Sequence, residues 1–204
     1  GCGGTGGFVA DGLCRLLLAL NRPDARVLLQ DHDRVEERNL LRQNFRRDDL
    51  GRFKAQALAE RLCRQYGRPI AFRIAPFELP PYGPGAADLL LGCVDNAPAR
   101  AELAKAVRPP GWLIDAGNGE DFGQVLVGNA EEDSLGGAFA PQTGICRALP
   151  LPTLQLPELA FAAAPAALDP NCAVAVQQGD QSPVVNHMMA SLVLEVVRRL
   201  LLGS

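Results

Sequence analysis

The chain has 204 residues, of which 48% are hydrophobic, and its net charge of −3 corresponds to a pI of about 5.4. This composition is that of a globular domain and excludes a disordered tail, while the acidic balance argues against a nucleic-acid-binding protein. No apolar run approaches the roughly 20 residues that a membrane span needs, and no leader precedes the first glycines. We therefore expect a cytoplasmic protein with no membrane partner.

The apolar pattern of the first two thirds alternates between helical and strand periods. We expect helices over 8–20, 53–66 and 97–107, the second with a basic outer face, and strands over 26–30, 70–76, 88–93 and 112–116. A further strand over 124–127 follows too closely for a crossover helix and is expected to turn antiparallel. The sequence thus predicts an α/β fold with a Rossmann-like, doubly wound, mainly parallel sheet and an antiparallel extension.

The last third has a different character. Residues 134–171 are rich in Pro, Ala and Leu and predict a long crossover loop within a single domain spanning 1–204. A terminal helix is expected from Pro183, with an apolar repeat at Val184, Met188, Leu192, Val196 and Leu200. A nucleotide-binding glycine turn normally follows a buried strand. No such strand precedes Gly1, so we expect the central strand of the sheet to be missing from the sequence.

The glycine turn at the start of the chain, G-C-G-G-T-G-G, opens directly into the first helix. Glycines let a phosphate approach backbone N–H groups at a helix N-terminus, although such turns also bind NAD and FAD and a glycine run can be a flexible terminus. Asp31 and Asp33 follow the strand over 26–30, where a Rossmann-like fold places a carboxylate for ribose hydroxyls. These features fit NAD as well as ATP.

A dense set of polar groups follows in residues 39–54. Asn39, Arg42, Gln43 and Lys54 offer two amides, a guanidinium and an ammonium, which suit phosphate oxygens. A dehydrogenase needs no such density here. The neighbouring Arg46, Arg47 and Arg52 are interpreted as solvated.

Asp95 follows the apolar run D-L-L-L-G-C-V, at the carboxyl end of a predicted strand, and a lone carboxylate beside a triphosphate suits Mg²⁺. Asp95 and Asn96 could alternatively cap the following helix. Asn96 can serve as the cap while Asp95 binds the metal.

Four runs occur in this order: G-C-G-G-T-G-G, D-H-D-R-V-E-E-R-N-L-L-R-Q-N-F, D-L-G-R-F-K and C-V-D-N-A-P-A-R. Their order and spacing, from residue 1 to residue 100, resemble the ThiF/MoeB/HesA family of ubiquitin-activating-enzyme-like (E1-like) adenylyltransferases. Within it, the chain is most similar to the small bacterial ThiF-like proteins of the PRTRC type.

The resemblance implies a site and a reaction. It implies a phosphate-binding turn formed by Gly3, Gly4 and Gly6, with Asp31 as the ligand of the ribose. The ATP phosphates would be bound by Asn39, Arg42 and Lys54, with Gln43 beside them. The Mg²⁺ ligand would be Asp95. The implied reaction is adenylation of the C-terminal carboxylate of a small ubiquitin-like or sulfur-carrier-like protein that ends in glycine. An arginine from a partner subunit reaches the phosphates in this family, which implies a homodimer.

The six cysteines include no C-x-x-C pair, so no zinc is expected. Cys14, Cys63 and Cys93 fit buried apolar positions, whereas Cys2, Cys146 and Cys172 invite chemistry. Cys172 occupies the region where short activating enzymes carry a thioester-forming nucleophile, and it could equally begin a buried strand. Cys146, with Arg147 beside it, is the alternative nucleophile. His32 and His187 are interpreted as structural or solvated.

Two other functions remain open. One is an NAD-binding Rossmann dehydrogenase, against which the R-Q pair, Lys54 and C-V-D-N argue. The other is a non-catalytic scaffold that binds a ubiquitin-like protein, although such a scaffold has no reason to retain Arg42, Lys54 and Asp95 together.

Overall fold

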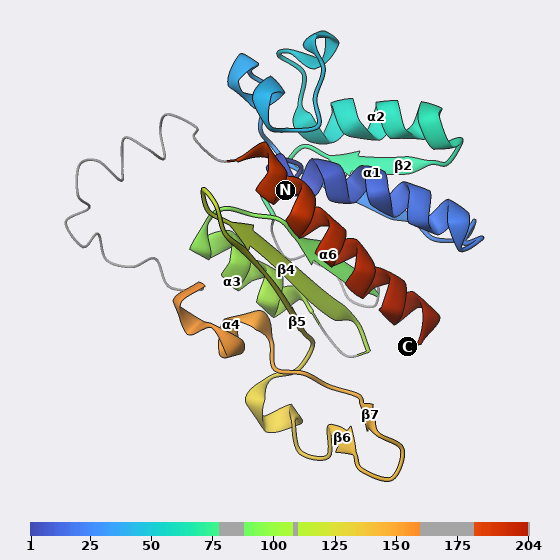
Figure 1. Ribbon diagram of the computed structural model, residues 1–204, viewed down its shortest axis with the longest axis vertical. Coiled ribbons are helices and arrows are strands. Elements are labelled where there is room, and N and C mark those ends of the chain that lie inside the picture. The colour runs from blue at the N-terminus through green and yellow to red at the C-terminus, as the bar shows by residue number, and fades with distance from the viewer. Residues whose placement is uncertain (78–87, 108–109, 160–181, 204) are drawn as a thin grey trace, which may run out of the picture. The chain divides into compact units, whose positions relative to one another are not determined.

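The computed structural model describes residues 1–77, 88–107, 110–159 and 182–203, and helices and strands alternate along them as the sequence predicts (Figure 1). These residues group into two compact units. Gly1–Pro76, Ala116–Gln124 and the C-terminal helix form the first unit, and the described residues of 77–115 and 125–159 form the second. The main elements are α1 (Gly4–Ala19), β1 (Val27–Gln30), α2 (Lys54–Tyr66), β2 (Ile70–Arg73), β3 (Leu89–Gly92), α3 (Ala97–Ala106), β4 (Trp112–Asn118), β5 (Gly123–Gly128) and α6 (Pro183–Leu202).

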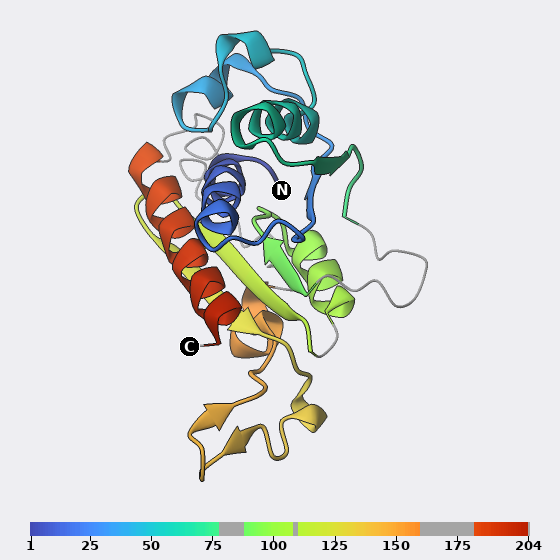
Figure 2. The same cartoon turned by 90° about the vertical axis from the view of Figure 1, so that its right-hand side faces the viewer.

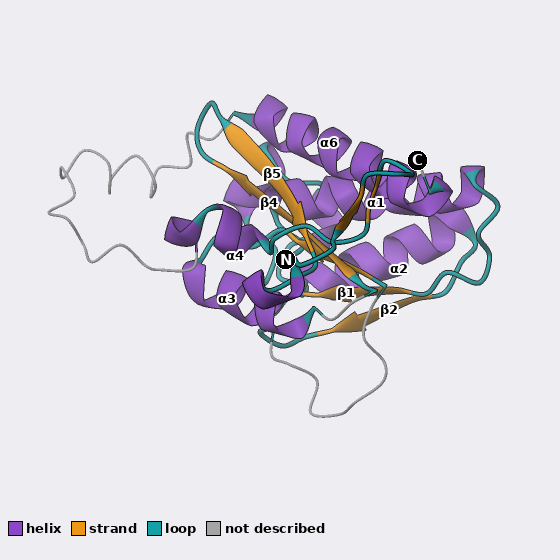
Figure 3. Ribbon diagram, turned by 90° about the horizontal axis from the view of Figure 1, so that it is seen from below, coloured by secondary structure: helices purple, strands orange, loops and turns teal. Residues whose placement is uncertain are grey.

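In the first unit, β1 and β2 pair in parallel, with Val27 opposite Ile70. Helix α2 connects the two strands, as parallel neighbours require, and lies along one face of the pair (Figure 3). Its apolar face packs into a core with α1 and β1, and the helix ends at Gly67, whose φ of 63° is left-handed. Strand β1 buries one face only: Leu28 points away from this core and is 53% exposed.

Helices α1 and α6 come from opposite ends of the sequence and pack side by side (Figure 2). Gly12 of α1 makes this close approach possible. A Cβ atom at this position would collide with the Leu194 side chain of α6. A glycine in the middle of a helix costs about 1 kcal/mol relative to alanine, and here it allows two helices to come together.

The buried face of α6 is formed by Val185, Met189, Val193 and Val197. The predicted terminal helix is present, but the apolar repeat noted in the sequence is not its buried face: Val184, Met188 and Leu192 are each more than half exposed. The helix carries two adjacent apolar stripes, and the sequence pattern does not distinguish the one that meets α1. None of the helices in the described ranges combines the length and apolar character needed to cross a membrane.

The second unit contains the parallel pair of β3 and β4, with Gly92 opposite Asp115, and α3 forms the connection between them. Strand β5 is the neighbour of β4 on the other side. Only four residues join β4 to β5, so the two form a hairpin, in agreement with the predicted antiparallel extension. A small core gathers around this sheet: Leu103, Ala104, Val107, Leu113 and Leu151.

The segment predicted as a crossover loop, 134–171, is more structured than a plain connection in its described part. Phe139–Ala140 (β6) pairs antiparallel with Ile145–Cys146 (β7), and Pro152–Gln155 forms the short helix α4. Leu151 is 2% exposed. The apolar residues of this segment are thus partly used for packing, which the low charge density did not reveal. Residues 160–171 lie outside the described part of the chain.

We predict that the two stripes of α6 differ in their effect on stability. Val193→Ala removes two methyl groups from a fully buried position and should lower the free energy of unfolding by about 2 kcal/mol. Leu192→Ala, on the half-exposed stripe, should change it by less than about 0.5 kcal/mol. Urea unfolding of both variants is the measurement. An equal loss in Leu192→Ala would contradict the register described here.

Candidate nucleotide site

The N-terminus of α1 lies within the glycine turn. The helix begins at Gly4, earlier than predicted, and Gly3 precedes it with no side-chain cap. No acidic residue stands in the first turn either. The first N–H groups of a helix have no partner inside the helix and carry the positive end of its dipole, so an uncapped N-terminus is suited to an anion.

The glycines of the turn differ in their surroundings. A Cβ atom at Gly4 would lie 2.6 Å from Oδ1 of Asn186, which is too close for any side chain. At Gly3 the same atom would meet the side-chain amide of Gln43 at 3.9 Å, an ordinary contact. Any side chain at position 4 would thus have to displace the Asn186 amide. Gly3 leaves the approach to the helix N-terminus open.

Asp31 ties the glycine turn to the end of β1. One of its carboxylate oxygens accepts a hydrogen bond from the backbone N–H of Cys2 at 2.6 Å, and the other accepts one from the N–H of Asp33 at 2.8 Å. A carboxylate has about four lone-pair directions, so these two bonds leave room for further donors. The structure therefore places Asp31 directly beside the turn, as the sequence suggested.

Lys54 is the first residue of α2 and is almost fully buried. Its Nζ lies 2.9 Å from Oδ2 of Asp33. Partial burial alone would raise the pKa of Asp33, but the hydrogen bond and the charge of Lys54 outweigh it and hold the pKa below its ordinary value. Two residues that the sequence assigned separately to the nucleotide are therefore partners of one another in this structure.

The segment that carries Asn39, Arg42 and Gln43 lies against the start of α1. Asn39 is buried, and its side chain accepts a hydrogen bond from the N–H of Glu36 at 2.9 Å, which caps a short 3₁₀ turn over Glu37–Leu41. Its geometry is that of a structural cap, and its role toward phosphate stays a prediction. Gln43 is next to Gly3, and its Oε1 is buried without a hydrogen-bond partner among the described residues.

The side chains of Asn44 and Arg61 hold the segment that carries Arg42 and Gln43 in place. The amide of Asn44 donates to the carbonyl of Gly7 in α1 at 3.2 Å. Arg61 of α2 donates to the carbonyl of Asn44 and forms a buried ion pair with Asp49 at 2.9 Å. The predicted basic outer face of α2 is thus wrong for Arg61, which points inward. Burial lowers the pKa of Arg61, and the charge of Asp49 opposes that effect.

Asn186 was missed by the sequence reading. It is a fully buried amide on α6. Its Nδ2 donates to the carbonyl of Arg42 at 3.2 Å, and its Oδ1 accepts from the hydroxyl of Thr5 at 3.4 Å. The only available signal was an asparagine within an otherwise apolar helical stretch.

Asp95 lies in the second unit, directly after β3. Asn96 caps α3 by accepting from the N–H of Ala99 at 2.9 Å, so the helix-cap role falls to Asn96. Asp95 is exposed and accepts a hydrogen bond from the Asn96 side chain at 3.2 Å. Arg100 donates to the carbonyl of Val94 at 2.8 Å and pairs with the buried Asp115 at 3.1 Å, which anchors the loop before Asp95.

The comparisons with known proteins bear on the family and the fold. The model of the ThiF family matches residues 1–203. The chain belongs to the ThiF family. Among solved structures, E. coli MccB with AMPCPP and selenomethionine MccA is similar at 18% identity and a TM-score of 0.60, over 98% of this chain and 53% of that one. E. coli MccB with ATP is similar at 20% identity and a TM-score of 0.59, over 98% and 54%.

This ThiF-family chain therefore spans about half the length of the MccB structures. At such identities the likeness shows the fold, a Rossmann-like α/β arrangement. No curated protein matches the chain.

The cysteines of this ThiF-family chain differ in accessibility. Cys2 and Cys14 are buried, and burial raises the pKa of Cys14 to about 11. Burial likewise raises the pKa of Cys93 to about 11. Cys146 is exposed. Cys172 lies outside the described residues.

The two histidines behave as interpreted from the sequence. His32 is solvated, with 61% of its side chain exposed, and the ring of His187 lies against that of Phe8 with centroids 3.7 Å apart. In the described ranges, the one grouping with metal-ligand spacing is Asp31, His32 and Asp33, and both of its carboxylates already accept hydrogen bonds from the protein.

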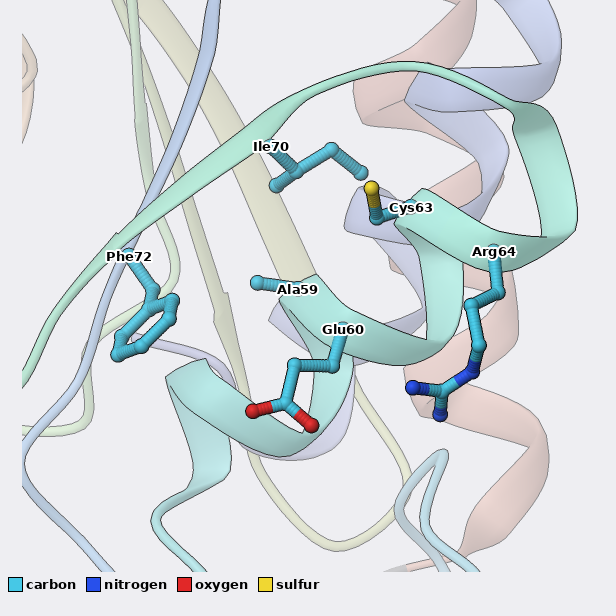
Figure 4. Close-up of a pocket in the computed structure, with 6 residues that line it drawn as sticks. All are labelled: Ala59, Glu60, Cys63, Arg64, Ile70 and Phe72. Atoms are coloured by element: carbon cyan, nitrogen blue, oxygen red, sulfur yellow. The ribbon is translucent and has the colours of Figure 1, made fainter.

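A shallow groove of about 270 Å³ runs between α2 and β2 (Figure 4). It is bordered by Ala59, Glu60, Cys63, Arg64, Ile70 and Phe72. None of the predicted nucleotide ligands borders it. The groove therefore does not bear on the nucleotide site.

We predict that the inward position of Arg61 is important for stability. Arg61→Met keeps much of the packing of the side chain but leaves Asp49 without its closest cation, and it should lower the free energy of unfolding by about 3 kcal/mol. Arg47→Met, at an exposed position, should change it by less than about 0.5 kcal/mol. Chemical denaturation compares the two. Similar small losses in both variants would show that Arg61 is not held inward.

Proposed function

We propose that this chain uses ATP to adenylate the C-terminal carboxylate of a small ubiquitin-like protein that ends in glycine. The observation that carries the proposal is the uncapped N-terminus of α1, which has the Gln43 amide and the Asp31 carboxylate beside it, in a chain of the ThiF family. A helix N-terminus supplies donors for phosphate, and a carboxylate beside it supplies acceptors for ribose hydroxyls.

Two MccB structures that share this fold contain a nucleotide, and one of them also contains MccA. MccB has been crystallised with ATP, and with AMPCPP together with MccA. By analogy, we propose ATP for this chain and a small protein as its acceptor substrate. We also propose that the active form is a cytoplasmic homodimer, because the family resemblance implies an arginine contributed by a partner subunit.

In the proposed reaction, a carboxylate oxygen of the acceptor attacks the α-phosphorus of ATP. The bond from that phosphorus to the pyrophosphate oxygen breaks, and an acyl adenylate and pyrophosphate result. No protein nucleophile is required for this step, so catalysis depends on positioning two anions and stabilising the charge on the phosphates. The N–H groups of α1, Arg42 and Lys54 would do this.

The pairing of Lys54 with Asp33 has a consequence for this role. Holding the ammonium in place reduces the side-chain entropy that Lys54 would otherwise lose when phosphate binds. Asp95 fits a magnesium ligand, since it is an exposed carboxylate at the carboxyl end of β3 whose loop is anchored by Arg100. Bound Mg²⁺ would supply neutralisation of phosphate charge.

We predict that Lys54→Met and Asp95→Ala lose activity by separate routes. Removing a phosphate contact at Lys54 should lower the rate of ATP–pyrophosphate exchange by about 10²–10³, with the acceptor carboxylate present. Asp95→Ala should abolish exchange while the circular dichroism and melting temperature stay those of the parent. Exchange at the parental rate in Asp95→Ala would contradict the metal assignment, and formation of NADH by the parent would favour the dehydrogenase.

We further propose that the acyl group passes from the adenylate to the thiol of Cys172, with release of AMP. Cys172→Ala should then retain pyrophosphate exchange but no longer form a thiol-reducible conjugate with the acceptor protein. Cys146→Ala is the matched control, because Cys146 is an exposed cysteine on β7. Loss of the conjugate in Cys146→Ala alone would assign the role to Cys146, and no reducible conjugate in the parent would indicate adenylation only.

A further inference from the structure

Asn186 brings together three parts of the first unit that are far apart in the sequence. From α6, its side-chain amide reaches the carbonyl of Arg42 at 3.2 Å and the hydroxyl of Thr5 in α1 at 3.4 Å. The same oxygen occupies the space that a side chain at Gly4 would need. Figure 2 shows α6 lying along α1, with its first turns near the start of the chain. The amide thus contacts both the glycine turn and the segment that carries Arg42.

Thr5 extends this contact to a second amide. Thr5 is 5% exposed, and its hydroxyl lies 3.1 Å from Oδ1 of Asn118, at the end of β4. One hydroxyl proton therefore faces two amide oxygens, those of Asn118 and Asn186. The start of α1 is held by polar contacts to α6 and to the end of a strand.

Burying the Asn186 amide has a cost in desolvation free energy. Transferring such a group out of water costs free energy unless its hydrogen bonds are replaced, and an apolar residue would pack the same position without that cost. What the amide provides instead is direction, because its hydrogen bonds are favourable only over a limited range of distance and angle. The position of Asn186 in an otherwise apolar face of α6 therefore points to a geometric role.

The geometry that it fixes is the separation between two halves of the nucleotide site. On one side is the uncapped first turn of α1, and on the other is the backbone of residues 42–44, whose Gln43 amide lies beside Gly3. Asn44 secures one end of that backbone to Gly7 of α1, and Asn186 secures the other at the carbonyl of Arg42. A phosphate could meet both halves at once only if this separation is held.

We propose that Asn186 is a positioning residue of the nucleotide site, which holds the Arg42–Gln43 backbone at a fixed distance from the glycine turn. This inference rests on the proposed function for the identity of the ligand. The proposal gives the C-terminal helix α6 a role in nucleotide binding, although none of the predicted nucleotide ligands lies on it.

Two variants of Asn186 test the proposal. Asn186→Asp keeps an acceptor for Thr5 but replaces the donor to the Arg42 carbonyl by an oxygen, and Asn186→Leu removes both hydrogen bonds while keeping a similar volume. Val197→Ala is the control, since it weakens the packing of α6 at a fully buried site about three helical turns away from Asn186. Each protein is titrated with MgATP by calorimetry, at a temperature where circular dichroism shows it folded.

We expect Asn186→Asp and Asn186→Leu to weaken MgATP binding by about tenfold, the effect of losing the hydrogen bond to the Arg42 carbonyl, which both variants remove. Val197→Ala should bind MgATP as the parent does, even if its melting temperature falls as much as those of the Asn186 variants. Parental affinity in Asn186→Leu, or equal weakening in Val197→Ala, would overturn the proposal, the second because it would trace the loss to general destabilisation.

A second measurement uses the protein without nucleotide. Amide hydrogen exchange should rise in residues 3–7 and 42–44 of Asn186→Leu and stay at the parental level there in Val197→Ala. If the parent binds no MgATP, the proposed function fails, and hydrogen exchange still decides whether Asn186 holds the two segments together. Unchanged exchange in both segments of Asn186→Leu would overturn that coupling.

Discussion

The uncapped N-terminus of α1 is the constraint on which the first unit depends. The first turn of a helix presents N–H groups that nothing inside the helix can bind, and here no described side chain caps it. The protein surrounds this turn with groups that hold its position and leave its end accessible. Asp31 binds the preceding N–H of Cys2, and Asn186 packs against Gly4. The glycine turn therefore has a defined place without a side chain at its tip.

Three buried or half-buried ion pairs hold loops in place in the same way. Arg61 with Asp49, Lys54 with Asp33 and Arg100 with Asp115 each join a charged side chain of a helix to a carboxylate on another segment. The two arginines also bind backbone carbonyls, those of Asn44 and Val94. Buried pairs add little net stability but cost several kcal/mol to break, so they fix loop position more than they strengthen the fold. Each of these loops carries a predicted ligand or lies next to one.

Much of the architecture could be predicted from the sequence, because helical and strand periods in the apolar residues decide which elements form. Asp31 could be placed beside the glycine turn from its position after β1. The face of α6 could not, because Val184 and Val185 begin two apolar stripes of similar strength. Nor could the direction of Arg61, because its partner Asp49 lies twelve residues earlier in a segment without a regular period. Asn186 was invisible for the same reason: its partners are residues 5 and 42, and only the fold brings them together.

The close contacts between α1 and α6 also determine how the helices can move. Gly4 faces Asn186 and Gly12 faces Leu194, so both helices run in the same direction and both contacts are spaced by eight residues. Eight residues are about 12 Å along a helix axis. If one helix slid past the other by a single turn, Asn186 and Leu194 would no longer face Gly4 and Gly12. They would face residues with side chains, for which there is no room. A shift of the glycine turn along its axis must consequently carry the whole of α6 with it.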